Sequence, residues 1–341
     1  MKCFTQNRLL WTCTLKVDNM FKFKTPSSKT LEIMSEVAKG NLTDDFEERC
    51  CEKITNLTSH EFVKVTSSGN NSILIALSSI EGDIIVPDQG GWHGFKQIAK
   101  FLNKNIITLK TDLGIINPKY LDDFEIPDKS ALIYTSFAGY SGEQDVKNIS
   151  KYCRDHDIIT IEDASAGIGD KKHNLGNGKY SDMIIASTGS PKMINVGSGG
   201  FISTNNKEFI DKTSVPQKLS KTNEIICSGI DNELNLVKEN LELTLNATKY
   251  LKNNIDNTLH ATKRGVNVII PDENAKVISW NLKKSLPINK SGFITTCPNY
   301  NRVKLKAIAI EIKNLSYDCL KKEYLDKIIE EVEINNQQQV L

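Results

Sequence analysis

The hydrophobic residues of this chain fall into short apolar runs that alternate with stretches of helical spacing. The runs are rich in Ile, Val and Thr, as buried strands are. We expect strands at residues 63–66, 84–87, 105–109, 131–135, 158–162, 183–187 and 200–204. Between several of these, apolar residues recur every three or four positions, which predicts helices at 71–79, 93–102 and 146–156. This alternation predicts βαβ units on a mostly parallel central sheet flanked by helices.

Two regions flank the alternation. Helical spacing from residue 27 to 57, interrupted near 41–43, predicts an N-terminal helical arm with Ser28 as its cap. A long helix over 232–253 is followed by strands at 266–270, 277–281 and 307–312 and a closing helix at 317–332. We expect three parts: an N-terminal extension and arm (1–57), a large domain (58–230), and a linking helix with a small α+β domain (231–341). Met20 is the expected biological start.

Composition narrows the classes of partner. With 43 basic and 42 acidic residues in 341, the net charge is +1, so the chain has no overall electrostatic field that would attract nucleic acid. The apolar runs are far shorter than the roughly 18 residues that a membrane span needs. Eight cysteines lack the spacing of a zinc site or a disulfide framework, so we expect no metal and a reducing, cytoplasmic environment.

Small and polar residues follow the predicted strands, where a parallel sheet binds its ligands. Ser68, Gly69 and Asn70 come after the strand at 63–66 and precede a helix, a pattern typical of phosphate sites and equally of a plain helix cap. Trp92 lies among glycines after the strand at 84–87. Its ring is suited to stack on a flat cofactor, and core filling is the alternative.

An acid and a lysine complete the set. Asp163 ends the strand at 158–162, and Lys192 follows Ser187 in a turn rich in Ser, Gly and Pro. Taken singly, Asp163 is a helix cap and Lys192 a surface lysine. Together they are what pyridoxal phosphate requires, an acid beside the pyridinium nitrogen and an amine that forms a Schiff base.

The order of these four elements resembles the DegT-type aminotransferases, which are fold-type I pyridoxal phosphate enzymes of the aspartate aminotransferase superfamily. The matching stretches are residues 68–70, 82–87, 161–164 and 187–200. The resemblance implies an α/β fold-type I architecture, pyridoxal 5'-phosphate as cofactor, and transfer of an amino group from an amino acid to a keto substrate. The best-known members act on keto sugars carried by nucleotides. It also implies a homodimer with composite active sites.

Residue roles follow from the resemblance by position. Lys192 matches the Schiff-base lysine and Asp163 the partner of the pyridinium nitrogen. Phosphate contacts are implied for Gly69 and Asn70, beside Ser68, and for Ser187. Trp92 falls one residue beyond the stacking aromatic of the family, with His93 as the alternative, and Asn232 is similar to an asparagine that the partner subunit contributes.

The chain departs from the family pattern around the substrate, where Ala166, Ser136 and Ser198 replace the usual side chains. It is therefore a divergent member. For the carboxylate of an amino donor we favour Arg302 over Arg264, with a surface role as the alternative for Arg302.

Two other functions stay open on the same scaffold. One is a pyridoxal phosphate lyase or sulfur-handling enzyme, for which Cys227 is the thiol of interest, with an inert buried cysteine as the alternative. The other is a catalytically silent regulatory protein.

Overall fold

A computed structural model describes residues 21–299 and 302–337, so the expected Met20 start and the preceding extension lie outside the described residues. The centre of the molecule is a seven-stranded sheet with the order β1-β9-β8-β7-β4-β2-β3. Its strands are β1 (Phe62–Thr66), β2 (Ile84–Pro87), β3 (Ile106–Leu109), β4 (Ala131–Thr135), β7 (Ile159–Asp163), β8 (Met183–Ser187) and β9 (Gly200–Thr204). The five strands from β8 to β3 are parallel, and β9 is antiparallel to both of its neighbours. The predicted mostly parallel sheet is confirmed.

Both faces of this sheet are buried, which explains the continuous apolar runs. In β4, Ala131 and Ile133 belong to one hydrophobic cluster, and Leu132 and Tyr134 belong to the other. Successive side chains of a strand point to opposite faces. The helices α3 (Gly69–Ser78) and α4 (Gly94–Phe101) cover one face, and α5 (Val146–Asp155) covers the other.

Further helices pack on either side of the large sheet and extend these layers. The N-terminal helices are α1 (Ser28–Ala38) and α2 (Phe46–Thr58). The cap of α1 is Ser27, whose side chain accepts from the Thr30 amide, so the predicted cap at Ser28 was wrong by one residue. After β9 come α6 (Lys207–Asp211), α7 (Ser214–Leu219), α8 (Glu224–Leu234) and α9 (Val237–Asn254).

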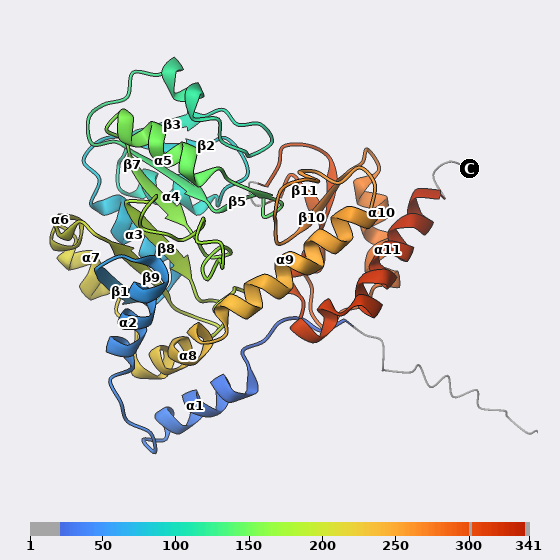
Figure 1. Ribbon diagram of the computed structural model, residues 1–341, viewed down its shortest axis with the longest axis horizontal. Coiled ribbons are helices and arrows are strands. Elements are labelled where there is room, and N and C mark those ends of the chain that lie inside the picture. The colour runs from blue at the N-terminus through green and yellow to red at the C-terminus, as the bar shows by residue number, and fades with distance from the viewer. Residues whose placement is uncertain (1–20, 300–301, 338–341) are drawn as a thin grey trace, which may run out of the picture.

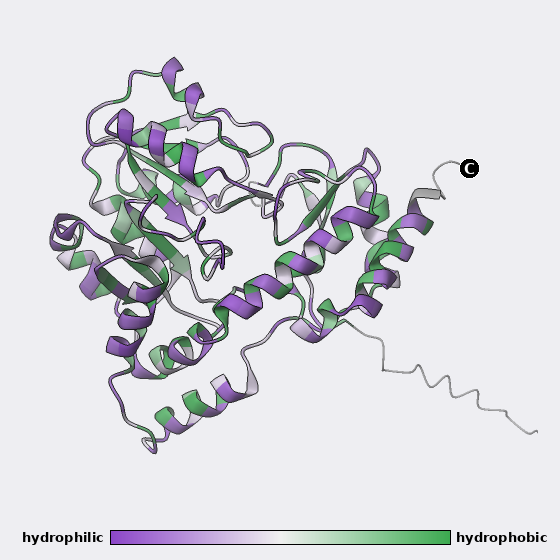
Figure 2. Ribbon diagram, viewed as in Figure 1, coloured by the Kyte–Doolittle hydropathy of each residue, from purple (hydrophilic) through white to green (hydrophobic). Residues whose placement is uncertain are grey.

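The long helix predicted over 232–253 is two helices, broken at residues 235–236. Its second part, α9, crosses the molecule in Figure 1 and joins two hydrophobic cores. Leu241 and Leu245 pack into the core beside the large sheet, whereas Ala247 and Leu251 pack into the core of the C-terminal part. The alternating hydropathy along α9 in Figure 2 reflects this two-sided packing.

The C-terminal part is built on a three-stranded antiparallel sheet with the order β10-β12-β11. Its elements are β10 (Val268–Pro271), α10 (Ala275–Ser285), β11 (Ile294–Cys297), β12 (Ala307–Ile310), the 3-10 turns η3 (Ile312–Asn314) and η4 (Tyr317–Leu320), and α11 (Lys322–Gln337). The predicted closing helix is therefore α11, preceded by a 3-10 turn.

The strand predicted at 277–281 was wrong, since these residues lie within α10. Val277 and Trp280 suggested a strand, yet each is 61% exposed. The buried positions, which include Ala275, Ile278 and Leu282, recur with helical spacing. The strand β11 was missed because its four residues are too short for a clear alternation.

Residues before α1 belong to the C-terminal part in space. Phe21 packs in that core, with its ring centroid 4.9 Å from that of Phe293, and the Lys24 amide donates to the Asn314 carbonyl at 2.8 Å. None of the helices within the described residues has the length and apolar character to cross a membrane.

Candidate functional site

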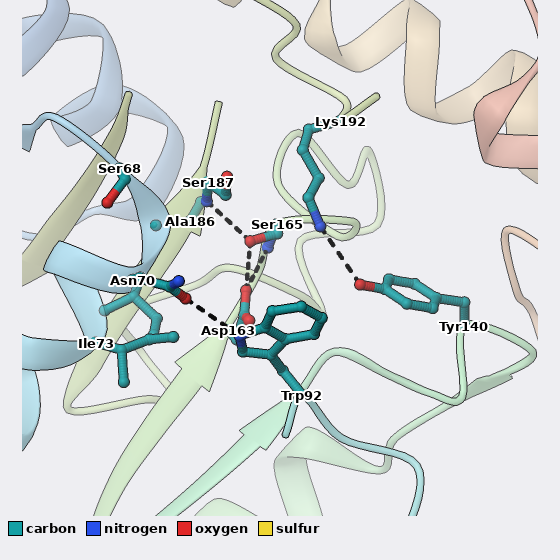
Figure 3. A pocket seen from close by; sticks show the side chains of 12 residues that line it. Ser68, Asn70, Ile73, Trp92, Tyr140, Asp163, Ser165, Ala186, Ser187 and Lys192 are labelled. Carbon is teal, nitrogen blue, oxygen red and sulfur yellow. Dashed lines mark hydrogen bonds between the residues drawn. The ribbon is translucent and has the colours of Figure 1, made fainter. Parts of the chain in front are cut away.

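A cavity of about 210 Å³ opens at the carboxyl ends of the parallel strands (Figure 3). Because these ends meet at one edge of a sheet, side chains distant in sequence converge there. Seven of the eight predicted site residues line this cavity: Ser68, Gly69, Asn70, Trp92, Asp163, Ser187 and Lys192.

The first wall of the cavity is the start of α3. Ser68 is the N-cap, and its side chain accepts from the Asn71 amide at 3.2 Å. Helix α3 contacts β8 at Gly69, where a Cβ atom would lie 2.5 Å from the Ser187 Cβ. Only glycine allows this approach. The first-turn amides of α3 and the Ser187 hydroxyl thus share one corner, which suits an anion.

Asp163 lies at the end of β7. Its Oδ1 atom accepts from the Ser165 hydroxyl at 2.5 Å and from the Ser165 amide at 3.0 Å. The Ser165 oxygen in turn accepts from the Ser187 amide at 2.8 Å. These bonds fix the carboxylate and join the ends of β7 and β8.

Trp92 follows β2 and closes the cavity on the side of Asn70. Its indole Nε1 donates to the Asn70 Oδ1 at 3.1 Å, and Figure 3 shows the ring beside Asp163. The His93 ring lies against Trp92, with 4.0 Å between centroids, and does not line the cavity. Of the two aromatic candidates, the structure brings Trp92 to the site.

Lys192 lies in the loop between β8 and β9. The loop is closed by the Val196 amide, which donates to the Thr188 carbonyl at 2.9 Å. Directly after Lys192, the side chains of Met193 and Ile194 are fully buried. This anchoring directs the Lys192 amine into the cavity, toward Tyr140.

Tyr140 lies in the hairpin of β5 (Phe137–Ala138) and β6 (Gly142–Glu143) and accepts from Lys192 Nζ at 3.4 Å. Burial lowers the pKa of Lys192, but Tyr140 and Asp163 outweigh it, so this pKa lies above the ordinary lysine value. Burial raises the pKa of Tyr140, but Lys192 and two further cations outweigh it, so that pKa is lowered.

Those two cations come from the C-terminal part. Lys313 Nζ lies 4.6 Å and the Arg302 guanidinium carbon 5.6 Å from the centre of the Tyr140 ring. Both form ion pairs with the buried Glu311, at 3.3 Å for Lys313. Burial lowers the pKa of Lys313 to about 7, with Arg302 and Lys192 adding to the effect and Tyr140 opposing it. Arg302 is thus a buried residue, and the surface role is wrong.

Other predicted residues lie elsewhere. Asn232 belongs to α8 and does not line the cavity of its own chain; its amide donates to the Thr30 hydroxyl at 2.8 Å. Arg264 is held by Glu143 at 2.6 Å and Asp170 at 2.7 Å. Cys227 is 1% exposed on α8, outside the cavity lining, so its thiol is not accessible from the cavity.

The departures from the family pattern have structural partners. Ser136 donates at 2.6 Å to the buried Glu162, and Ser198 donates at 3.1 Å to the Ser67 carbonyl. Ala166 is buried in the core beside the sheet. None of the three lines the cavity.

Sequence reasoning missed Tyr140, Ser165 and Lys313. The sequence does give one signal for Tyr140, because it follows a glycine a few residues after the buried strand β4. Ser165 lies two residues after Asp163, in a run of small residues that gives no sign of its bonds to Asp163 and Ser187. For Lys313 there was no local signal, since its neighbours are brought together only by the fold.

Two family models match the chain. Residues 27–225 match the DegT/DnrJ/EryC1/StrS aminotransferase family, and residues 238–333 match the MJ1341 family C-terminal domain. The first match includes every predicted site residue except Asn232 and covers more than half of the chain.

Sequence relatives are distant. The UDP-4-amino-4,6-dideoxy-N-acetyl-beta-L-altrosamine transaminase of Campylobacter jejuni is 28% identical over 178 residues, which are 51% of this chain and 46% of that protein. An uncharacterised protein of Methanocaldococcus jannaschii is 30% identical over 100 residues, 29% of this chain and 25% of that one. The chain thus spans less than half the length of either relative.

Solved structures share the fold over most of the chain. A DegT DnrJ EryC1 StrS aminotransferase from Brucella abortus has a TM-score of 0.68 at 14% identity, covering 89% of this chain and 94% of that one. The NtdA protein of Bacillus subtilis, with bound cofactor PMP, has a TM-score of 0.65 at 16% identity, covering 90% and 82%. The expected fold-type I architecture is confirmed.

Proposed function

Because the chain belongs to the DegT/DnrJ/EryC1/StrS aminotransferase family, we propose that it transfers an amino group from an amino acid to a keto substrate with pyridoxal phosphate. One observation carries this proposal: Lys192, Asp163 and the Ser68 to Asn70 turn, which are far apart in sequence, line one cavity. An amine, an acid and an anion site are the three groups that this cofactor needs.

The residues around the cavity fit the cofactor. The start of α3 and the Ser187 hydroxyl would bind the phosphate, in the corner where Gly69 lies closest to Ser187. The Trp92 ring would cover the flat ring of the cofactor. Asp163, with one oxygen fixed by Ser165, would hold the proton of the pyridine nitrogen. When bound, the cofactor supplies an electron sink for the chemistry at the substrate.

Lys192 has two tasks in this proposal. Its amine would bind the cofactor covalently through a Schiff base, and once freed by the amino donor it would move a proton at the substrate α-carbon. The amine lies in the cavity and is buried between Tyr140 and the loop that carries it.

The acceptor is proposed as a keto substrate, with a keto sugar on a nucleotide as the class suggested by the Campylobacter jejuni transaminase. Because the chain departs from the family pattern at Ala166, Ser136 and Ser198, we expect the groups that recognise the acceptor to differ from those of the family.

Replacing Lys192 with alanine tests the cofactor assignment. The wild-type protein should develop a visible absorbance band when pyridoxal phosphate is added, and Lys192→Ala should not, because no amine remains in the cavity to bind the cofactor. Lys207→Ala, which removes an exposed lysine, is the control and should keep the band. A Lys192→Ala protein that retains the band would contradict the assignment.

Titration of the loaded protein with a panel of amino acids tests the reaction type. A transaminase converts the visible band to that of pyridoxamine phosphate without a second substrate, and a keto acid restores it. Release of sulfide or pyruvate instead would identify a lyase. A band that no amino acid changes would support the catalytically silent alternative.

We also propose a homodimer in which Asn232 of one copy completes the site of the other. Mixed dimers of Lys192→Ala and Asn232→Ala subunits would then hold one intact site each. Activity should reappear when the two inactive variants are unfolded and refolded together, although neither has activity alone. If the mixture stays inactive while the subunits exchange, the composite site is wrong.

A further inference from the structure

Tyr140 has an unusual electrostatic environment. Three cations surround its ring: Lys313 at 4.6 Å, and Lys192 and Arg302 each at 5.6 Å from its centroid. Lys192 also donates to the phenolic oxygen at 3.4 Å. A phenol in such surroundings is stabilised in its anionic form, because each cation attracts the phenolate oxygen at low dielectric constant.

Two carboxylates complete these surroundings. Asp163 lies on the cavity side and opposes ionisation of the phenol. Glu311, on the other side, accepts from Thr295 at 2.8 Å and pairs with Arg302 and Lys313. Arg302 balances the charge of Glu311, so Lys313, whose pKa lies at about 7, leaves positive charge beside Tyr140 at and below neutral pH.

Backbone contacts fix the phenol between the two parts of the molecule. The Tyr140 carbonyl accepts from the amides of Val266 at 2.8 Å and Asn267 at 3.0 Å, which precede β10. The Lys313 amide donates to the Val266 carbonyl at 3.0 Å. The hairpin that carries Tyr140 and the segment that carries Lys313 therefore keep one relative position.

We propose that Tyr140 is the proton partner of Lys192, and that Lys313 and Arg302 stabilise the phenolate form in which it acts. The phenolate takes one proton from the Lys192 ammonium: an N–H bond breaks, an O–H bond forms, and the electron pair of the broken bond stays on nitrogen. The products are a neutral phenol and a neutral, nucleophilic amine. The proton returns by the reverse transfer. The inference rests on the proposed role of Lys192.

Burial makes this exchange accessible. Two opposite charges in contact lose much of their hydration when buried, which offsets part of their attraction, so the neutral pair lies less far above the charged pair than the attraction alone would place it. The charge of Arg302 lowers the pKa of Tyr140, which favours the phenolate. It also lowers the pKa of Lys192, which disfavours the ammonium. The cations of the small domain thus act on the reactive lysine through Tyr140.

Ultraviolet titration of tyrosinate in the full chain without cofactor is the first test. The difference between wild type and Tyr140→Phe should contain an ionisation below the ordinary tyrosine value of about 10. Tyr152→Phe is the control, because burial and its bond to Asp122 raise the pKa of Tyr152 to about 12. That variant should keep the early ionisation. An early step that survives in Tyr140→Phe would overturn the proposal.

The pH dependence of cofactor attachment is the second test, followed by the growth of the visible band. In Tyr140→Phe the midpoint should move to lower pH, because burial and Arg302 then act on the Lys192 amine without the opposing phenolate. A merely structural role would lower the rate without moving the midpoint. An unchanged midpoint would overturn the proposal.

Lys313 gives a matched comparison. Lys313→Met should move the Tyr140 ionisation to higher pH, and Lys313→Arg, which keeps the charge, should restore it. Lys284→Met removes a lysine that lies over the Trp280 ring instead, and it should leave the ionisation unchanged. Equal effects of Lys313→Met and Lys284→Met would contradict the role of Lys313. The tyrosinate titration needs no cofactor. A titration without the early ionisation would contradict the role of Tyr140 even if Lys192→Ala loses the visible band, and a Lys192→Ala protein that keeps the band would contradict the cofactor assignment even if the early ionisation is found.

Discussion

At the scale of single residues, positions at strand ends were predictable and positions that depend on several segments were not. Asp163 and Lys192 each carry a local signature, a buried strand before the acid and a turn of small residues before the lysine. Lys313 lies in a 3-10 turn after β12 and reaches Tyr140 only because two sheets meet. Lys24 was equally unpredictable, because the residues next to it in the sequence do not indicate that it is buried.

Lys24 gives a prediction on stability. Its amine lies 4.5 Å from the centre of the Tyr317 ring and has no hydrogen-bond partner among the described residues. Burial, with Lys313 adding to it and Glu233 opposing it, lowers the pKa of Lys24 to about 7. We expect Lys24→Met to raise the free energy of unfolding by about 1–4 kcal/mol at pH 6, since an apolar side chain replaces a buried charge.

The sign of the pH effect follows from proton binding. Between pH 7 and the ordinary lysine value of 10.5, the unfolded chain holds the Lys24 proton and the folded chain does not. Deprotonation of Lys24 in the folded chain therefore makes the free energy of unfolding of the wild type rise with pH over that window. The advantage of Lys24→Met should shrink toward pH 10, as measured by urea unfolding at several pH values. An advantage that grows with pH would contradict the assignment.

At the scale of elements, the strands of the central sheet were predicted well because their burial on both faces leaves continuous apolar runs. The C-terminal part was predicted poorly. Residues 277–281 have the composition of a strand, and their place in α10 is decided by which positions are buried. Composition therefore does not predict this helix, whereas the spacing of Ala275, Ile278 and Leu282 does.

The contact of α3 with β8 gives a prediction at this scale. Gly69→Ala should weaken pyridoxal phosphate binding by about tenfold or more and lower the melting temperature, because the new Cβ would lie 2.5 Å from the Ser187 Cβ. Gly189→Ala is the matched control, since its Cβ would lie 3.4 Å from the Ser187 hydroxyl, an ordinary contact. Similar cofactor affinities for the two variants, measured by absorbance titration, would show that the close approach is unimportant.

At the scale of the whole molecule, one lysine joins three segments. Lys252, near the end of α9, donates to the carbonyls of Ser141 at 2.5 Å, His260 at 2.9 Å and Lys263 at 3.0 Å. Ser141 follows Tyr140, and the other two carbonyls belong to the loop before β10. Burial lowers the pKa of Lys252 to about 8. The amine fixes α9 to the hairpin of β5 and β6 and to the loop before β10.

Removing this amine should loosen the connection between these segments. We expect Lys252→Met to lower the free energy of unfolding by about 2–4 kcal/mol, because three carbonyls lose a charged donor. Lys249→Met, at an exposed position of the same helix, should change it by less than about 0.5 kcal/mol. Chemical unfolding of the three proteins compares them directly, and equal stabilities would show that the amine is dispensable.

The place of Trp92 has an optical consequence. Its indole lies in the cavity proposed for the cofactor, whereas Trp280 is 61% exposed on α10. The turn that carries Trp92 is bound to the C-terminal part, because the Gly90 amide donates to the Arg302 carbonyl at 3.0 Å. The emission of Trp92 would therefore be quenched by energy transfer to a bound chromophore and would change if the C-terminal part shifted relative to the large sheet. Trp92→Phe, which keeps Trp11 and Trp280, would show how much of the quenching comes from this indole, so the molecule contains its own fluorescent reporter of ligand binding.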